Sequence, residues 1–132
     1  MRQIGFELIG RDSVAAAREI VTVAVEALER AGVSKLALDF TLPDLVEQLS
    51  PDMAPDRLAE LRDRLDAKDA AGVAAIDPGF LPLIEAAGPF DAALERLRAL
   101  DKGGALTSRL DGLAAVAQAV AGQVALTLDP TE

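Results

Sequence analysis

A helix followed by a glycine and then a strand occurs twice in this chain, and this arrangement constrains the fold more than any other feature. The first unit is an Ala/Val-rich helix expected over 14–31, then Gly32 and the alternating segment 36–40. The second is an Ala/Leu-rich helix, then Gly122 and the alternating segment 124–128. Apolar residues recur at spacings of three and four in both helices. We therefore predict an α+β fold in which both helices bury an apolar stripe against one small sheet.

The opening residues 2–10 alternate in a similar way. Read as a strand, they place Gln3 and Glu7 on one face, and Phe6 and Leu8 on the other, because side chains alternate across a pleat. The segment would supply a third strand. We predict a small antiparallel or mixed sheet of about three strands packed by helices.

Composition supports a single hydrophobic core. The chain has 132 residues, of which 51% are hydrophobic and 27% charged, as in an ordinary globular domain. Aromatic residues make up only 3%, all of them Phe. Because Ala, Leu and Val must then fill the core, closely packed helices are favoured.

The middle of the chain, 42–104, is divided by Pro and Gly into short apolar segments. These breakers predict a cluster of short helices, over 42–49, 55–68, 70–76, 80–87 and 91–100. We expect residues 1–41 and 105–132 to form an α/β core, with the short-helix region 42–104 inserted into it.

Local signals place the ends of several elements. Asp12 or Ser13 is suited to cap the first long helix, and Gly32 to end it in a left-handed conformation. Thr41 with Asp44 resembles a capping box at the start of the next helix.

The residue types present limit the chemistry. The chain has no Cys and no His, which excludes thiol and imidazole catalysis and the usual zinc sites. Carboxylate pairs such as Asp63 with Asp66 are commonplace on a charged helix face, and we assign no catalytic residue, metal or cofactor. A net charge of −9 argues against nucleic acid as a partner. No apolar run is long enough for a membrane span, and a cytoplasmic location follows as the default.

The pattern Gln-x-Gly-x-Glu-x-Ile-Gly, followed by a long helix, Gly32 and the strand KLALDF, resembles the class II histidyl-tRNA synthetase family just after its motif 2 loop. The resemblance implies a partial class II synthetase-like core. It also implies that the opening strand forms part of the floor of the amino-acid site, with Gln3 and Glu7 beside bound histidine.

Within that family, the closer resemblance is to the regulatory subunits of ATP phosphoribosyltransferase, a branch without aminoacylation activity. It implies a non-catalytic role in histidine biosynthesis, with the catalytic subunit of ATP phosphoribosyltransferase as partner and histidine as effector. Acidic residues outnumber basic ones twelve to six between Asp44 and Arg98, which suits this branch better than a tRNA-binding one.

Two other functions remain open from the sequence. One is a fragment of a catalytic histidyl-tRNA synthetase. The other is a freestanding helical interaction domain that docks a partner through a stripe of Leu58, Leu61 and Leu65. A homodimer through an unpaired strand edge is a further alternative. Because strands are expected so close to both ends, we expect the chain to be a piece of a larger protein and to bind histidine weakly by itself.

Overall fold

The fold is a small mixed sheet with helices on one face. The structure is a computed structural model that describes residues 5–10 and 12–131. Within these ranges the sheet has three strands, in the order β1 (Ala37–Thr41), β3 (Ala125–Asp129) and β2 (Gly88–Pro89). β1 runs parallel to β3, whereas β2 runs antiparallel to it. The predicted α+β fold with a mixed three-stranded sheet is confirmed.

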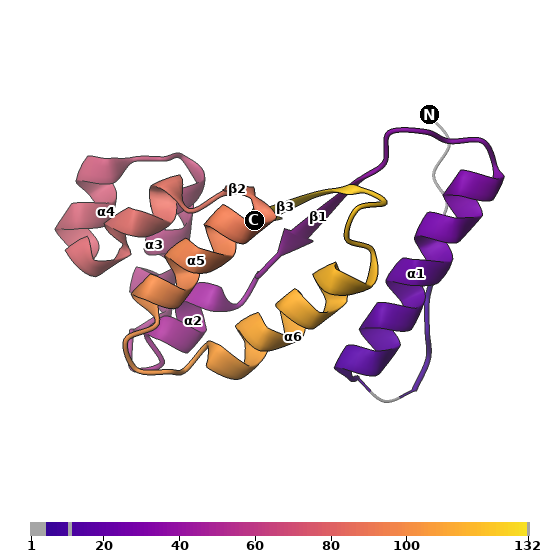
Figure 1. Ribbon diagram of the computed structural model, residues 1–132. Helices are drawn as coiled ribbons and strands as arrows, with labels where there is room; N and C mark the ends of the chain where they lie inside the picture. Colours follow the sequence, from indigo (N-terminus) through magenta and orange to yellow (C-terminus); the bar gives the residue numbers. More distant parts are fainter. Residues whose placement is uncertain (1–4, 11, 132) are drawn as a thin grey trace.

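Three of the helices form a layer beside the sheet (Figure 1). They are α5 (Phe90–Leu100), α6 (Thr107–Ala119) and α1 (Val14–Arg30). α5 packs against β2 and β3, and α1 packs against α6. The two helix–Gly–strand units thus lie next to each other, because β1 pairs with β3 and their preceding helices also touch.

The short elements gather at one end of the sheet (Figure 1). They are α2 (Leu45–Leu49), α3 (Pro55–Asp66), α4 (Ala70–Ile76) and the 3-10 helix η1 (Pro78–Glu85). Pro55 and Pro78 each occupy a first turn, where a missing N–H costs no helical hydrogen bond. The predicted run of short helices is confirmed, with η1 tighter than the expected α-helix.

One hydrophobic core joins the sheet, its helix layer and the short helices. Phe40 of β1 lies against Phe90 of α5, with ring centroids 5.0 Å apart. β2 and α5 come from the region 42–104, yet they pack on β3. The division into 1–41 with 105–132 and an inserted 42–104 stays a prediction, and the core is continuous across its boundaries.

The helix ends show which of the predicted capping residues form caps. The N–H of Ala16 donates to Ser13 Oγ at 3.1 Å, and Gly32 has a left-handed φ of 83°. The capping box expected at Thr41 and Asp44 is wrong, because α2 begins after Asp44 and has no side-chain cap. The Asp44 carboxylate instead binds Arg109 and Gln48.

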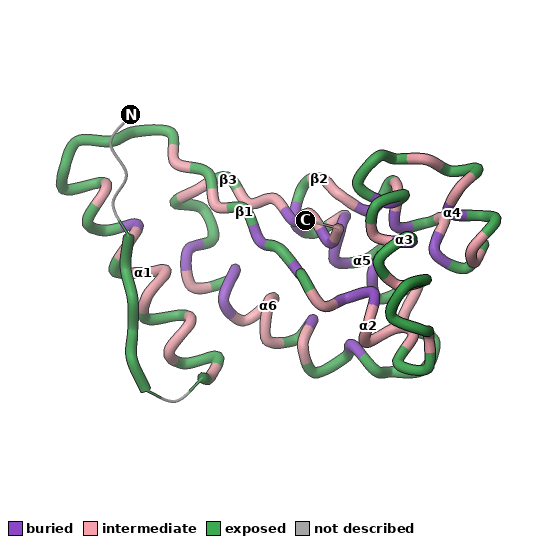
Figure 2. The backbone as a smooth tube through the Cα atoms, turned by 180° about the vertical axis from the view of Figure 1, so that it is seen from behind, coloured by how far each residue is buried: buried purple, intermediate pink, exposed green. Residues whose placement is uncertain are grey.

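The opening segment differs from its prediction. Residues 5–9 are exposed and in no strand, and they make no backbone hydrogen bond to another described residue. Figure 2 shows this part of the chain running beside α1. The third strand of the sheet is β2 instead. An alternating segment becomes a strand only where a neighbouring backbone accepts its hydrogen bonds.

Candidate ligand-binding surfaces

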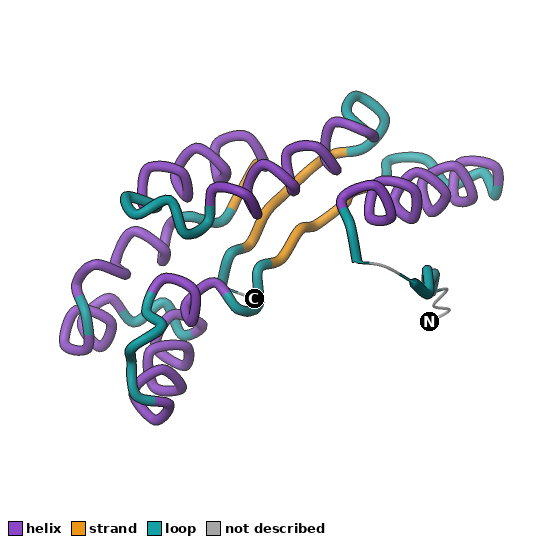
Figure 3. Tube along the Cα trace, turned by 90° about the horizontal axis from the view of Figure 1, so that it is seen from below, coloured by secondary structure: helices purple, strands orange, loops and turns teal. Residues whose placement is uncertain are grey.

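The face of the sheet opposite the helices is polar and open. Along β1, Leu38 and Phe40 face the helix layer, while Asp39 and Thr41 are exposed on the other face. Thr127 of β3 lies on this second face, in register with Asp39. In Figure 3, α5 and α6 lie along one side of the strands, and no described helix crosses the other.

This surface, which we call the open face, presents two pairs of side chains across β1 and β3. Asp39 is paired in register with Thr127, and Thr41 with Asp129. Carboxylate and hydroxyl oxygens accept hydrogen bonds, so the open face suits a ligand rich in N–H groups. Thr127 Oγ1 is buried and has no hydrogen-bond partner within the described residues.

Asp129 is already partly engaged. Its Oδ1 accepts hydrogen bonds from the backbone N–H and the hydroxyl of Thr131, at 3.0 and 2.9 Å. This turn orders the chain just after β3. Asp39 makes no side-chain hydrogen bond to another described residue, so it is the more available carboxylate of the open face.

Of the two sequence-predicted site residues, the structure describes only Glu7, and it does not bring Glu7 onto the open face. Gln3 lies outside the described residues. Glu7 is exposed in the opening segment and makes no ion pair with another described residue. Sequence reasoning missed Asp39 and Thr127, although the alternation of 36–40 and 124–128 already carried the signal. What it did not give was the pairing of β1 with β3.

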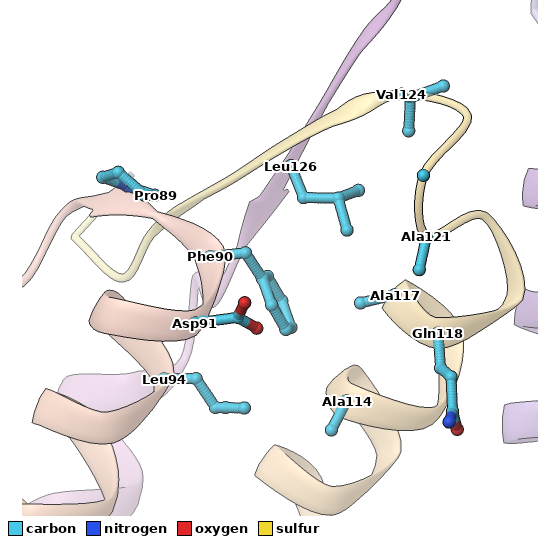
Figure 4. A pocket seen from close by; sticks show the side chains of 11 residues that line it. Pro89, Phe90, Asp91, Leu94, Ala114, Ala117, Gln118, Ala121, Val124 and Leu126 are labelled. Atoms are coloured by element: carbon cyan, nitrogen blue, oxygen red, sulfur yellow. The ribbon is translucent and has the colours of Figure 1, made fainter.

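A second candidate surface is a hollow between α5 and α6 over β3, which we call the groove. It has a volume of about 450 Å³. Figure 4 shows Phe90, Leu94 and Leu126 pointing into it, opposite Ala114 and Ala117. The alanines leave the space because their side chains are too short to fill it. Its lining is mainly apolar. Asp91 lies in the first turn of α5, where the positive end of the helix dipole stabilises a carboxylate.

A group of ion pairs and hydrogen bonds lies beyond the end of β1 and holds helices together. Arg109 of α6 pairs with Asp44 Oδ1 at 2.5 Å, and the Gln48 amide donates to Oδ2 at 2.7 Å. The Arg109 hydrogen bond, outweighing desolvation and supported by Gln48, lowers the pKa of Asp44 to about 2. Arg62 of α3 pairs with Glu47 and donates to the Pro43 carbonyl at 2.7 Å. These contacts fix α2 between α3 and α6.

A hydrogen bond and an ion pair likewise join α3 to α4. The N–H of Gly72 donates to Asp69 Oδ1 at 3.0 Å, and Arg64 pairs with Oδ2 at 3.0 Å. The Gly72 hydrogen bond, with help from Arg64, lowers the pKa of Asp69.

Among the described residues, no group of three or more His, Cys, Asp or Glu side chains is arranged to hold a metal ion. No helix in the described ranges combines the length and the apolar character needed to cross a bilayer.

Comparison with known proteins adds a family. The family model described as histidyl-tRNA synthetase matches residues 1–132. The chain is 38% identical to the ATP phosphoribosyltransferase regulatory subunit of Rhodospirillum rubrum, over 98% of this chain and 36% of that protein. It is 37% identical to the protein of the same name from Paramagnetospirillum magneticum, over 98% and 37%. The corresponding protein of Chromobacterium violaceum is 36% identical, over 98% and 37%.

The chain thus spans little more than a third of the length of these relatives. No solved structure matches it significantly.

Proposed function

Because this chain belongs to the histidyl-tRNA synthetase family, we propose that it is part of a regulatory, non-catalytic subunit of ATP phosphoribosyltransferase in histidine biosynthesis. One observation carries this proposal. The similarity to proteins of that name covers 98% of the chain, at 34–38% identity. The proposed role has two parts, a contribution to a histidine-binding pocket and a contribution to assembly with the catalytic subunit.

In the proposed pocket, Gln3 and Glu7 contact histidine. At neutral pH the ligand carries an ammonium group and an imidazole with an N–H. A carboxylate such as Glu7 pairs with either group, and the Gln3 amide both donates and accepts. The open face supplies a matching acceptor from Asp39, which is exposed on β1 and stands beside Thr127 of β3. The ligand would lie over the polar face of the sheet, away from the helix layer.

The acidic character of the chain supports regulation over aminoacylation. With a net charge of −9, the chain lacks the excess of basic residues that contact with a tRNA backbone requires. The interaction-domain alternative loses its basis, because Leu61 and Leu65 are 0% and 1% exposed. Those leucines belong to the core of the short-helix cluster and leave no stripe for a partner.

The test exchanges the matching segment of the Rhodospirillum rubrum relative for residues 1–132, in complex with a catalytic subunit of ATP phosphoribosyltransferase. We expect the exchanged protein to assemble and histidine to inhibit the complex. Glu7→Gln should raise the half-inhibitory histidine concentration about tenfold, because a hydrogen bond to a charged group contributes 1.5–3 kcal/mol.

Glu26→Gln is the matched control, since Glu26 is exposed on α1 and, among the described residues, pairs only with Arg30 four residues on. Its half-inhibitory concentration should equal that of the unsubstituted protein. Failure to assemble with the catalytic subunit, or charging of tRNA with histidine by the exchanged protein, would refute the proposal. Calorimetry on the 132-residue chain alone should show weak histidine binding at most.

A further inference from the structure

The groove between α5 and α6 has a fixed shape. Beyond one end of it, Arg98 of α5 pairs with Asp111 of α6 at 2.7 Å, which ties the two helices together. The lining begins one turn further along each helix, at Leu94 and Ala114. From there on, α6 presents only short side chains to the groove until Gln118, so the space between the helices stays unfilled (Figure 4).

The groove is a depression in a core that is already closed. Phe90 and Leu94 are only 4% and 9% exposed, although both line it. None of the exposed large apolar side chains of the described residues belongs to the lining. Permanent interfaces resemble a core cut in half and leave such side chains bare when they are separated. The groove therefore suits a separately folded partner that inserts an anchoring side chain.

The charge at the groove indicates the chemistry of that partner. Asp91 is the only charged residue of the lining, and it is exposed. Its carboxylate lies beside the Phe90 ring (Figure 4) and forms no ion pair with another described residue. The whole chain carries a net charge of −9. A basic side chain next to the apolar anchor is the complement of this surface.

We propose that the groove receives one large apolar side chain of the catalytic subunit of ATP phosphoribosyltransferase, next to a lysine or arginine that pairs with Asp91. The identity of this partner rests on the proposed function, whereas the chemistry of the contact follows from the groove itself.

The position of the groove fits a subunit that must hold a partner and an effector at once. Leu126 of β3 lines the groove, and the next residue, Thr127, lies on the open face in register with Asp39. The groove and the open face are thus on opposite sides of one strand. A partner seated in the groove leaves the open face free for histidine.

The test fills the groove in the exchanged regulatory subunit, that is, the Rhodospirillum rubrum relative that carries residues 1–132. Ala114→Leu places a larger side chain where the anchor would lie, and it should weaken binding of the catalytic subunit about tenfold or more. Ala99→Leu is the matched control, since Ala99 is exposed on α5 and lies outside the groove. It should leave the dissociation constant unchanged. Isothermal titration calorimetry measures both.

A charge reversal tests the basic side chain separately. Asp91→Lys should weaken the complex about tenfold at low salt, and by less as the salt concentration rises. Glu95→Lys makes the same change one turn further along α5, at an exposed residue that does not line the groove. It should change the dissociation constant by about twofold at most.

Four results would overturn the proposal. One is unchanged affinity for both Ala114→Leu and Asp91→Lys, and another is equal weakening by Ala114→Leu and Ala99→Leu. A third is a lower thermal midpoint of the regulatory subunit alone with Asp91→Lys, matched by no loss with Glu95→Lys, which would mean that another part of the same subunit covers the groove. The fourth is a changed oligomeric state of the regulatory subunit alone in analytical ultracentrifugation, which would assign the groove to a second copy.

The proposed function fails by a different result. If the unsubstituted exchanged subunit does not bind the catalytic subunit, the proposed function is refuted and the partner named here with it. If it binds and the groove variants bind equally well, the proposed function stands and only the groove assignment is wrong.

Discussion

Residues 5–33, which we call the arm, and residues 36–131, the body, bury their apolar side chains to different extents. The arm contributes only Val25 to the buried apolar residues. All six exposed large apolar side chains of the described residues belong to the arm: Phe6, Leu8, Ile9, Val14, Val23 and Val33. In the body, α5 has the sheet beneath it and α6 beside it, whereas α1 has α6 on one flank and an apolar hollow of about 290 Å³ below it.

The difference shows what an apolar stripe does and does not determine. α1 and α5 have similarly amphipathic sequences, and both form regular helices. The free energy gained from each stripe depends on the apolar area that its neighbours cover. The body stabilises itself through a continuous core, and the arm stays attached to it mainly through the contact of α1 with α6.

The most direct test of this difference in burial is to truncate one leucine in each region. Leu97 of α5 is completely buried, so Leu97→Ala should lower the free energy of unfolding by about 3 kcal/mol, through lost transfer energy and a cavity. Leu28 of α1 is half-buried beside the hollow, and Leu28→Ala should cost about 1 kcal/mol. Urea unfolding monitored by circular dichroism measures both.

Equal costs for the two leucines would mean that the arm is as well packed as the body. A single cooperative transition is expected for Leu97→Ala. For the arm, hydrogen exchange of the α1 amides should show opening at a lower free energy than global unfolding.

A glycine tests a cap that belongs to the body alone. A Cβ on Gly72 would lie 2.4 Å from Asp69 Oδ2 and 2.6 Å from Arg64 Cδ. Gly72→Ala must therefore displace the carboxylate that caps α4, and we expect a loss of about 1 kcal/mol despite the better helix propensity of alanine. The thermal midpoint should fall. An unchanged midpoint would show that the Asp69 cap contributes little.

The ion pair of Asp44 and Arg109 should have a smaller effect, and one that depends on pH. The pKa of Asp44 is about 2 in the folded state, against an ordinary value of 3.8, so its ionised form stabilises the folded state fully above about pH 4. That contribution is lost as the pH falls towards 2. Because Asp44 is half-exposed, solvent screening reduces it to about 1 kcal/mol or less.

Arg109→Met removes the partner of Asp44 while retaining an apolar stem. At pH 7 the variant should be less stable than the unsubstituted chain, and below pH 2 the two should converge in urea unfolding. Arg98→Met is a useful comparison, since Arg98 pairs with Asp111 at 2.7 Å and no other described residue hydrogen-bonds to that carboxylate. A difference for Arg109→Met that stays constant down to pH 2 would rule out the ion pair as its cause.

Capping and helix-breaking residues explain why so much of the body was predictable from the sequence. α4 spans Ala70–Ile76 as expected, because Asp69 caps it and Asp77-Pro78-Gly79 ends it. The alternating segments at 36–40 and 124–128 form β1 and β3 with a shift of one residue. By contrast, β2 consists of Gly88 and Pro89, which have no strand pattern. It exists because α5 packs on β3 and holds the preceding residues against that strand.

The candidate site was less predictable, for a related reason. Alternation in each strand separately placed Asp39 and Thr127 on polar faces, yet their proximity depends on a pairing between segments almost ninety residues apart. For the opening segment, alternation identified two chemically different faces but no partner strand. Gln3 and Glu7 came from the family resemblance, and their role stays a proposal.

The smallest expected effect lies where the arm meets the body. Gly112 of α6 faces α1, and a Cβ there would lie 3.2 Å from Val14 Cγ2. Val14 is at the exposed first turn of α1, so it can yield by the few tenths of an ångström required. Gly112→Ala should therefore stabilise the chain by a few tenths of a kcal/mol, most of the roughly 1 kcal/mol propensity gain being offset by this contact. Destabilisation by 1 kcal/mol or more would mean that Val14 is held rigidly, and that the arm is docked on the body more tightly than the exposure of its side chains indicates.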